Sequence, residues 1–327
     1  MSSRPFLLVA AFLAVLSVSG GCAAPQAPSL GEPVRVGQMR NDELHLREIP
    51  LERYVAGVLE KEVHASWPKE ALKAQAVAAR TYVLYRKQKP RDAQFDVLAD
   101  TSDQVFESDE GHAKSIVRAV LETEGETLEY GGKLIQAFFH SCCGGKSERA
   151  SRVWPGAHPE PVLQIHDDPY CASCPPAHWT YRIPRSELES RLREAGHEMP
   201  EEWTISVPDR DESGRVVSIA VGAPGPKARA FTMTGADFRA AIGYVNIKST
   251  LFEVSSEGGD VVFEGRGSGH GVGLCQWGAK AMAGQGKSYR EILEFYYPGA
   301  EIVPMSRNIA AHPSTEERIL QDLEKSE

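Results

Sequence analysis

Residues 269–278 have the sequence Gly-His-Gly-Val-Gly-Leu-Cys-Gln-Trp-Gly, in which four glycines surround one histidine. Glycine permits positive φ angles and a close approach of the backbone, so this pattern predicts a tight turn beside a bound partner. Held in such a turn, His270 and the following Gln276 could line a substrate groove. The glycine spacing differs from that of a dinucleotide-binding fingerprint. The alternative is a glycine-rich turn in which the histidine has no chemical role.

Glu62 has the placement that general acid catalysis needs. Apolar side chains recur at helical spacing between Leu51 and Leu59, which predicts a helix over residues 51–63. On that helix Glu62 falls on the apolar face, four residues after Val58. Because apolar surroundings penalise the charged form, the pKa of this carboxylate should rise, which suits a proton donor. The alternative is that Glu62 lies in the last turn and points to water.

Cysteine and histidine side chains gather in two short stretches that could bind a metal. Cys171 and Cys174 have the spacing of half a zinc site, and His140 with Cys142 or Cys143 could supply the other half. Four protein ligands, for which we take His140, Cys143, Cys171 and Cys174, would make that zinc structural. Three ligands would let the metal activate water. Disulfides between the two stretches and free thiols remain open.

An alanine-rich helix is predicted to follow Glu62. Ser66 is suited to be its N-cap, and the helix should extend to about Lys87. Its alanines would let another element pack closely. The polar residues Gln75, Arg80 and Tyr82 could reach sugar hydroxyls, or they could form a solvated face.

Further elements should position the second group of candidates. A helix is predicted over residues 109–122, followed by a β-hairpin with strands at 127–130 and 134–139. The second strand would deliver His140 and Ser141 to the site. A strand at 261–263 and a helix from Leu274 to Ala283 should flank the glycine-rich segment, and Ser288 opens a capping box for the last helix.

Composition and the N-terminal sequence restrict the partners and the cellular location of the protein. The chain has 327 residues, is 42% hydrophobic and carries a net charge of −9, which argues against a nucleic-acid partner. Arg4 precedes an apolar run over residues 6–18, and small residues then lead to Cys22. This pattern predicts a signal peptide over 1–22 of the lipoprotein type, with Cys22 lipidated, or plain secretion. Five cysteines remain, and an odd number leaves one outside any pairing.

The rest of the chain divides into a tether, a main domain and a tail. Proline and glycine over 23–36 predict a flexible tether, and the segment 305–327 is a charged tail. The main domain spans 37–304 and includes a more polar insertion at about 175–245. We expect an α+β fold, with mixed helices and antiparallel sheet around a substrate cleft and a smaller inserted subdomain.

Two ordered blocks resemble the SpoIID/LytB family, the group of stage II sporulation protein D and the amidase enhancers. The first block comprises residues 54–62 and 71–82, and the second comprises 269–279. Residues 140–145 and the pair at 153–154 also fit. The resemblance covers roughly residues 35–302, with a weaker middle.

The resemblance implies a peptidoglycan-active protein. The sporulation members are lytic transglycosylases that cut glycan strands stripped of stem peptides, and their catalytic acid is a glutamate at the position of Glu62. Glu62 would protonate the oxygen between N-acetylmuramic acid and N-acetylglucosamine and then act as base on the muramic 6-hydroxyl. One carboxylate is enough for this reaction, whereas glycosidases use two. Candidate glycan contacts are Gln75, Arg80, Tyr82, Ser141, His270 and Gln276.

Other functions remain possible alternatives to the transglycosylase. Some members carry zinc held by His and Cys, which implies a structural zinc here, although the reaction requires no cofactor. Other members enhance a cell-wall amidase, which would make that amidase a partner and Glu62 dispensable. A metal-dependent hydrolase would use His140 and the cysteines, and a cysteine peptidase would use Cys275 with His270. With Cys22 lipidated, the protein is expected to be exported and anchored in the envelope, facing the periplasm.

Overall fold

The computed structural model describes residues 33–305, except 101–102, 107, 109, 155–160, 173 and 224–229. The predicted signal peptide with Cys22 lies outside the described residues, as does the predicted tail from residue 306 onward. Strand β1 begins at Val34, so the last residues of the predicted tether already belong to a sheet. Within the described residues, no helix combines the length and the apolar character needed to cross a membrane.

The larger part of the fold, which we call the helical lobe, combines residues 34–154 with residues 268–305. Its helices are α1 (Leu51–Glu62), α2 (Lys69–Gln88), α3 (Lys114–Glu122), α4 (Ala150–Val153), α7 (Gln276–Gly284) and α8 (Tyr289–Tyr296). Its strands are β1 (Val34–Arg40), β2 (Glu43–Ile49), β3 (Val97–Leu98), β4 (Glu126–Tyr130), β5 (Lys133–Leu134), β6 (Phe139–His140), β13 (Leu274–Cys275) and β14 (Glu301–Pro304). They form small sheets of order β2-β1-β3, β14-β4-β5 and β13-β6.

Helix α2 is the centre of this lobe because its small side chains allow neighbours on several sides. Ala74, Ala76, Ala78 and Ala79 are all 0% exposed, and they contribute to both hydrophobic cores of the lobe. The helix begins after Pro68, and the Ser66 hydroxyl hydrogen-bonds to the ring of His64. The prediction that Ser66 is the N-cap was therefore wrong.

The predicted hairpin is shorter than expected. Strand β5 ends at Leu134. The Ile135 amide still donates across the hairpin to Leu128, but the Ala137 amide donates to Ile135 and that of Phe138 to Gln136. The chain then pairs as β6 in parallel with β13 near the C-terminus. This long-range pairing places His140 opposite Cys275, which periodicity along one segment cannot predict. Helix α3 likewise begins at Lys114, later than predicted, after an extended Ala113.

The second part, which we call the inserted lobe, spans residues 178–266. Its elements are β7 (His178–Pro184), α5 (Arg185–Glu194), β8 (Thr204–Arg210), β9 (Val216–Gly222), β10 (Ala230–Thr234), α6 (Gly235–Ile242), β11 (Phe252–Glu257) and β12 (Asp260–Arg266). A short 3-10 turn, η1 (Pro175–Ala177), precedes them. The two antiparallel sheets have the orders β10-β9-β8 and β11-β12-β7.

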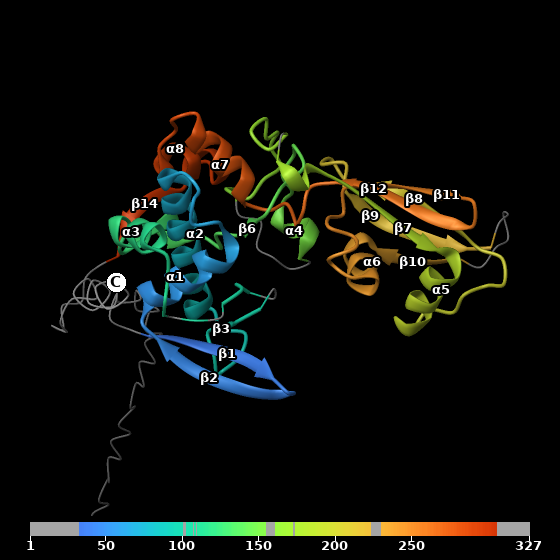
Figure 1. The fold of residues 1–327 in the computed structure, drawn as a ribbon, viewed down its shortest axis with the longest axis horizontal. Coiled ribbons are helices and arrows are strands. Elements are labelled where there is room, and N and C mark those ends of the chain that lie inside the picture. Colours follow the sequence, from blue (N-terminus) through green and yellow to red (C-terminus); the bar gives the residue numbers. More distant parts are fainter. Residues whose placement is uncertain are drawn as a thin grey trace, which may run out of the picture.

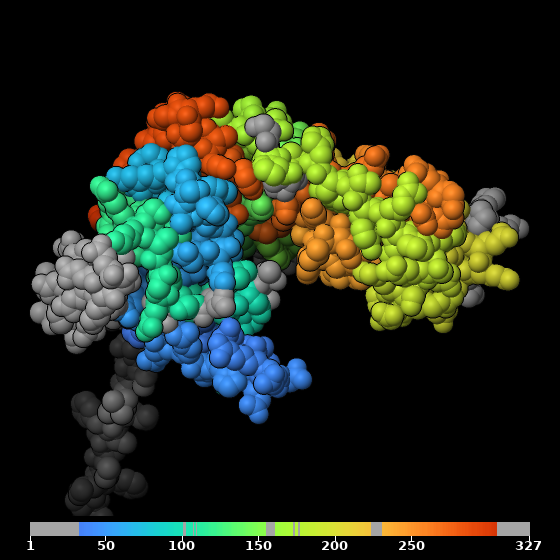
Figure 2. Space-filling model, in the orientation of Figure 1, coloured from blue at the N-terminus to red at the C-terminus, as the bar shows by residue number. Residues whose placement is uncertain are grey.

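The inserted lobe has its own hydrophobic core, which includes Trp179, Phe238 and Phe263. Because Phe263 belongs to this core, the insertion extends beyond the predicted end near residue 245. Figure 1 shows the two lobes side by side, with β6 and α4 between them. In Figure 2 the orange and red C-terminal part of the chain contributes to both lobes. The described residues confirm the predicted α+β class.

Candidate functional site

Glu62 and Gln276 meet across the helical lobe although 214 positions separate them in sequence. The Gln276 amide Nε2 donates a hydrogen bond of 2.9 Å to Glu62 Oε2. Glu62 ends α1 and is partly exposed, whereas Gln276 opens α7 and is 3% exposed. Burial raises the pKa of the Glu62 carboxyl, and the hydrogen bonds from Gln276 and the Val105 backbone only partly oppose this. A partly exposed carboxyl with a raised pKa can donate a proton.

The glycine-rich segment makes that meeting possible. Gly267, Gly269, Gly271 and Gly273 have φ angles of 78°, 102°, 85° and 71°, values that favour glycine. A Cβ at Gly273 would collide with the Phe138 carbonyl oxygen. The segment therefore passes close against β6 and delivers β13, with Gln276 immediately after it.

A row of rings runs beside this segment. Tyr82 packs on Phe138 with ring centroids 5.8 Å apart, and Phe138 stacks on Trp154 at 4.1 Å. The Trp154 ring then meets His270 at 4.9 Å, and His270 lies 5.4 Å from His140. Both histidines thus belong to this row of rings, which we call the aromatic row.

The two histidines are held neutral. Burial lowers the pKa of His270 to about 3, and its Nδ1 accepts a hydrogen bond from the Val272 backbone N–H. Burial also lowers the pKa of His140 far below its usual value, and its Nδ1 lies 3.1 Å from the Val272 carbonyl oxygen. Both imidazoles therefore bond to the backbone of Val272 in the glycine-rich segment.

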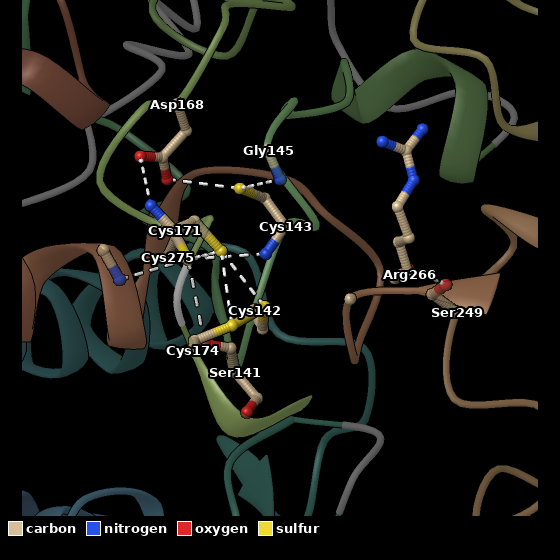
Figure 3. The surroundings of a disulfide bond; sticks show 12 residues. Ser141, Cys142, Cys143, Gly145, Asp168, Cys171, Cys174, Ser249, Arg266 and Cys275 are labelled. Carbon is tan, nitrogen blue, oxygen red and sulfur yellow. Dashed lines mark hydrogen bonds between the residues drawn. A yellow bond between two sulfur atoms is a disulfide. The ribbon is translucent and has the colours of Figure 1, made fainter. Parts of the chain in front are cut away.

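The five cysteines of the described chain form one buried group, which we call the sulfur cluster (Figure 3). Cys142 and Cys174 form a disulfide. Cys171 lies with its Sγ 3.0 Å from Cys142 Sγ and 3.4 Å from Cys275 Sγ. The thiol of the fifth cysteine, Cys143, contacts Asp168 Oδ2 at 3.2 Å.

Three of these cysteines, together with Asp168, are placed to hold a metal ion. Ligand atoms of Cys143, Asp168, Cys171 and Cys275 all lie within 4.8 Å of one another, and all four residues are buried. Three thiols and one carboxylate are donors that zinc accepts in a tetrahedral site. The Tyr296 hydroxyl donates to Asp168 Oδ2 at 2.9 Å, which would orient that ligand.

This arrangement divides the metal-ligand set predicted from the sequence. Cys143 and Cys171 are in the donor group, but Cys174 is in the disulfide. His140 directs one ring nitrogen to a backbone carbonyl and belongs to the aromatic row. Asp168 and Cys275 take their places in the donor group, and the sequence spacing did not reveal either of them.

Sequence comparisons with known proteins cover most of this chain. A sequence profile for the stage II sporulation protein family matches residues 40–130. The stage II sporulation protein D of Bacillus amyloliquefaciens is 33% identical over 293 residues, which cover 84% of this chain and 80% of that protein. This chain belongs to the stage II sporulation protein D family.

Two other proteins similar to this chain are matched over different shares of their own length. An uncharacterized protein of Brachyspira hyodysenteriae is 37% identical over 264 residues, covering 80% of this chain and 69% of that protein. The amidase enhancer of Bacillus subtilis is 29% identical over 295 residues, but the match spans only 40% of the enhancer. A profile described as a domain of unknown function matches residues 175–273, which contain the inserted lobe.

The three residues of α2 that were predicted to contact the glycan are instead bonded or buried inside the protein. Arg80 is 0% exposed and forms an ion pair with Glu52, its Nε lying 2.9 Å from Oε1, so it is structural and does not face a ligand. Tyr82 donates its hydroxyl to Asp103 at 2.9 Å. Gln75 is 1% exposed, below the surface of α2.

Ser141 and Trp277 complete the neighbourhood of Glu62 in this family member. The Ser141 carbonyl accepts a hydrogen bond of 3.1 Å from the Trp277 backbone N–H. The described site therefore brings Glu62, Gln276 and Ser141 onto adjoining segments, while Arg80 and Gln75 belong to the interior. Because the small side chains of α2 let it pack on several sides, the sequence pattern alone could not tell which of its polar residues are buried.

Proposed function

We propose that this protein is a peptidoglycan lytic transglycosylase that cleaves bonds between N-acetylmuramic acid and N-acetylglucosamine, with Glu62 as general acid and base. The single observation that carries the proposal is the Glu62 carboxyl, partly exposed, with a raised pKa and fixed by Gln276. Family membership supports a role at the cell wall.

The proposed reaction needs one proton carrier. Glu62 protonates the glycosidic oxygen while the bond from that oxygen to C1 of the muramic residue breaks. The resulting carboxylate then takes the proton from the 6-hydroxyl as O6 bonds to C1, which yields a 1,6-anhydro product and restores the acid. The side chain that holds Glu62 is a neutral amide, which leaves the carboxyl free to change its charge twice.

The deciding experiment is mass spectrometry of products from purified peptidoglycan, both intact and amidase-treated. Wild-type protein should release anhydro-muramic products, and Glu62→Gln should release them at a greatly reduced rate. Glu60→Gln is the matched control, because Glu60 lies on the same helix but is exposed. Product formation at the wild-type rate in Glu62→Gln would remove Glu62 from the mechanism.

A second candidate function is enhancement of a cell-wall amidase by a glycan-binding protein, and the likeness to the amidase enhancer of Bacillus subtilis favours it. This function predicts that Glu62→Gln stimulates a purified cell-wall amidase as well as wild type does. The peptidase alternative loses support, because Cys275 is 1% exposed and its thiol lies in the sulfur cluster.

We further propose a structural zinc held by Cys143, Asp168, Cys171 and Cys275. Bound there, zinc would tie together segments of distant sequence, and a shell of four protein donors would leave no place for a reactive water. This disfavours a metal-dependent hydrolase. The purified protein should contain one zinc per chain. Cys171→Ser should lose the zinc and melt at a lower temperature, whereas Cys142→Ser combined with Cys174→Ser should keep it.

We also propose that the protein is exported and anchored in the envelope through lipid on Cys22. Residues before Pro33 lie outside the described structure, so this proposal rests on the sequence pattern. Metabolic labelling with an alkyne fatty acid should mark the wild-type protein and not Cys22→Ala. Equal absence of label in both proteins would indicate plain secretion.

A further inference from the structure

A hollow on the inserted lobe lies apart from Glu62 and the sulfur cluster. It has a volume of about 530 Å³ and lies over strands β7 and β12. This volume is in the range of small-molecule sites. The hollow is lined by His178, Trp179, Thr180, Glu264, Gly265 and Arg266. The proposed reaction uses none of these residues.

Strand pairing places four polar side chains on one face of this sheet. The antiparallel register sets Glu264 opposite Thr180 and Arg266 opposite His178. Paired residues share a face, and residues two apart along a strand also share it, at a spacing of about 7 Å. All four side chains are exposed. The hollow therefore presents a carboxylate, a guanidinium, a hydroxyl and an imidazole to one ligand.

The opposite face of the two strands is packed against the core of the inserted lobe. Trp179 belongs to that core and is 7% exposed. A Cβ at Gly265 would collide with the Trp179 ring, and the ring Nε1 donates to the Gly267 carbonyl oxygen at 3.0 Å. The polar side chains thus project from a backbone that is fixed on its other side, as a preformed binding site requires.

The charges of Glu264 and Arg266 are not neutralised within the protein. In the part of the chain that the structure describes, neither side chain forms an ion pair or a hydrogen bond. Figure 3 shows the Arg266 side chain extending away from the sulfur cluster. Other charges of the same sheet are paired, as Arg182 is with Glu257 at 2.5 Å. Two open charges of opposite sign, about 7 Å apart along one strand, match a ligand that carries both signs.

We propose that this hollow binds the zwitterionic head of an amino acid. The ligand carboxylate would accept hydrogen bonds from Arg266 and His178, and its ammonium would donate to Glu264 and the Thr180 hydroxyl. A simple anion would meet the Glu264 carboxylate, and a simple cation would meet the Arg266 guanidinium, so the two charges together select a zwitterion. In a cell wall, this chemistry occurs in a free diamino acid and at the end of a stem peptide that carries one.

Titration calorimetry of the full-length protein can measure this binding. The first probe is N-acetyl-L-alanyl-γ-D-glutamyl-meso-diaminopimelic acid, whose diamino acid carries a free ammonium and carboxylate on one carbon. Two blocked forms have that ammonium acetylated or that carboxylate amidated, and the last probe is free meso-diaminopimelic acid. The unblocked tripeptide should bind with a dissociation constant on the order of millimolar, and each blocked form about two- to fivefold more weakly, as expected for exposed ion pairs.

Single substitutions separate the two charges. Glu264→Gln should lose the preference for the free ammonium over its acetylated form, and Arg266→Gln should lose the preference for the carboxylate over its amide. Both side chains are exposed and unpaired in the described structure, so the melting temperature should stay unchanged. Arg182→Gln and Glu257→Gln remove the same charges from a paired position on this sheet and should bind as wild type does.

Equal binding of free and blocked tripeptides by wild type would overturn the proposal, as would unchanged preferences in Glu264→Gln and Arg266→Gln. Equal affinity for the free diamino acid and the tripeptide would support it with the head group alone as ligand. Tighter binding of the tripeptide would support it with a stem peptide as the source.

This site is independent of the proposed reaction. Glu62→Gln should bind the tripeptide as wild type does. If wild type yields no anhydro products but the binding preferences hold, the proposed function fails and this site stands.

Discussion

The two lobes differ in where they place their polar and charged side chains. The helical lobe buries polar and charged groups, among them Glu52, Arg80 and Glu148, which are 3% exposed or less. The inserted lobe keeps a core of aliphatic and aromatic side chains and places its ion pairs at the surface, as in Arg182 with Glu257. Burial of polar groups is costly unless they are paired, so its concentration in one lobe marks where geometry must be fixed.

One buried charged residue of the inserted lobe lies at its boundary with the helical lobe. Arg215 belongs to the inserted lobe but is 2% exposed, and its guanidinium donates to the carbonyl oxygens of Cys143 at 2.8 Å and Lys146 at 3.2 Å. It thus holds the loop that follows Cys142 and Cys143 of the sulfur cluster. The inserted lobe acts on the site by supporting that loop, and the described contacts give it no side chain beside Glu62.

The largest expected difference between the lobes is in catalysis. Glu62→Gln removes the proposed proton carrier and should lower the rate of anhydro-product formation by roughly 10²–10⁴-fold, the usual contribution of general acid–base catalysis. Glu257→Gln makes the same chemical change in the inserted lobe, at an exposed ion pair, and should leave the rate unchanged. Equal losses in both variants would contradict the assignment of chemistry to the helical lobe.

The next difference is in stability. Arg80→Met leaves Glu52 as a buried unpaired acid and should reduce the free energy of unfolding by about 3–5 kcal/mol. The combination of Arg80→Met with Glu52→Leu should recover much of that loss, because no charge then remains without a partner. Arg182→Met, which breaks the exposed pair, should not measurably shift the urea midpoint. A similar midpoint shift in Arg80→Met and Arg182→Met would refute the contrast between buried and surface charges.

Sequence patterns predicted what depends on neighbours along the chain. The helix ending at Glu62, the capping box at Ser288 and the flanking elements of the glycine-rich segment were all found within a few residues. Periodicity could not predict the parallel pairing of β6 with β13, because that contact joins segments far apart in sequence. For the same reason Asp168 and Cys275 were missed as candidate metal donors, and Arg80 was assigned to the ligand although it pairs with Glu52.

The smallest expected effect tests how the helical lobe sets the proton affinity of Glu62. The hydrogen bond from Gln276 lowers the pKa of Glu62, against the larger opposing effect of burial. Gln276→Leu removes that donor, so the pKa should rise further. Because the acid must be protonated to act, activity is lost as the pH rises through this pKa.

The alkaline limb of the pH–rate profile should therefore move to higher pH in Gln276→Leu, by about one unit or less, while the maximal rate also falls. Gln285→Leu, at the other end of α7 and exposed, should keep the parental limb. A limb that moves to lower pH in Gln276→Leu would mean that the amide favours the protonated carboxyl. Gln276 would then act by accepting the proton of Glu62, and the donor and acceptor assigned to this contact would be reversed.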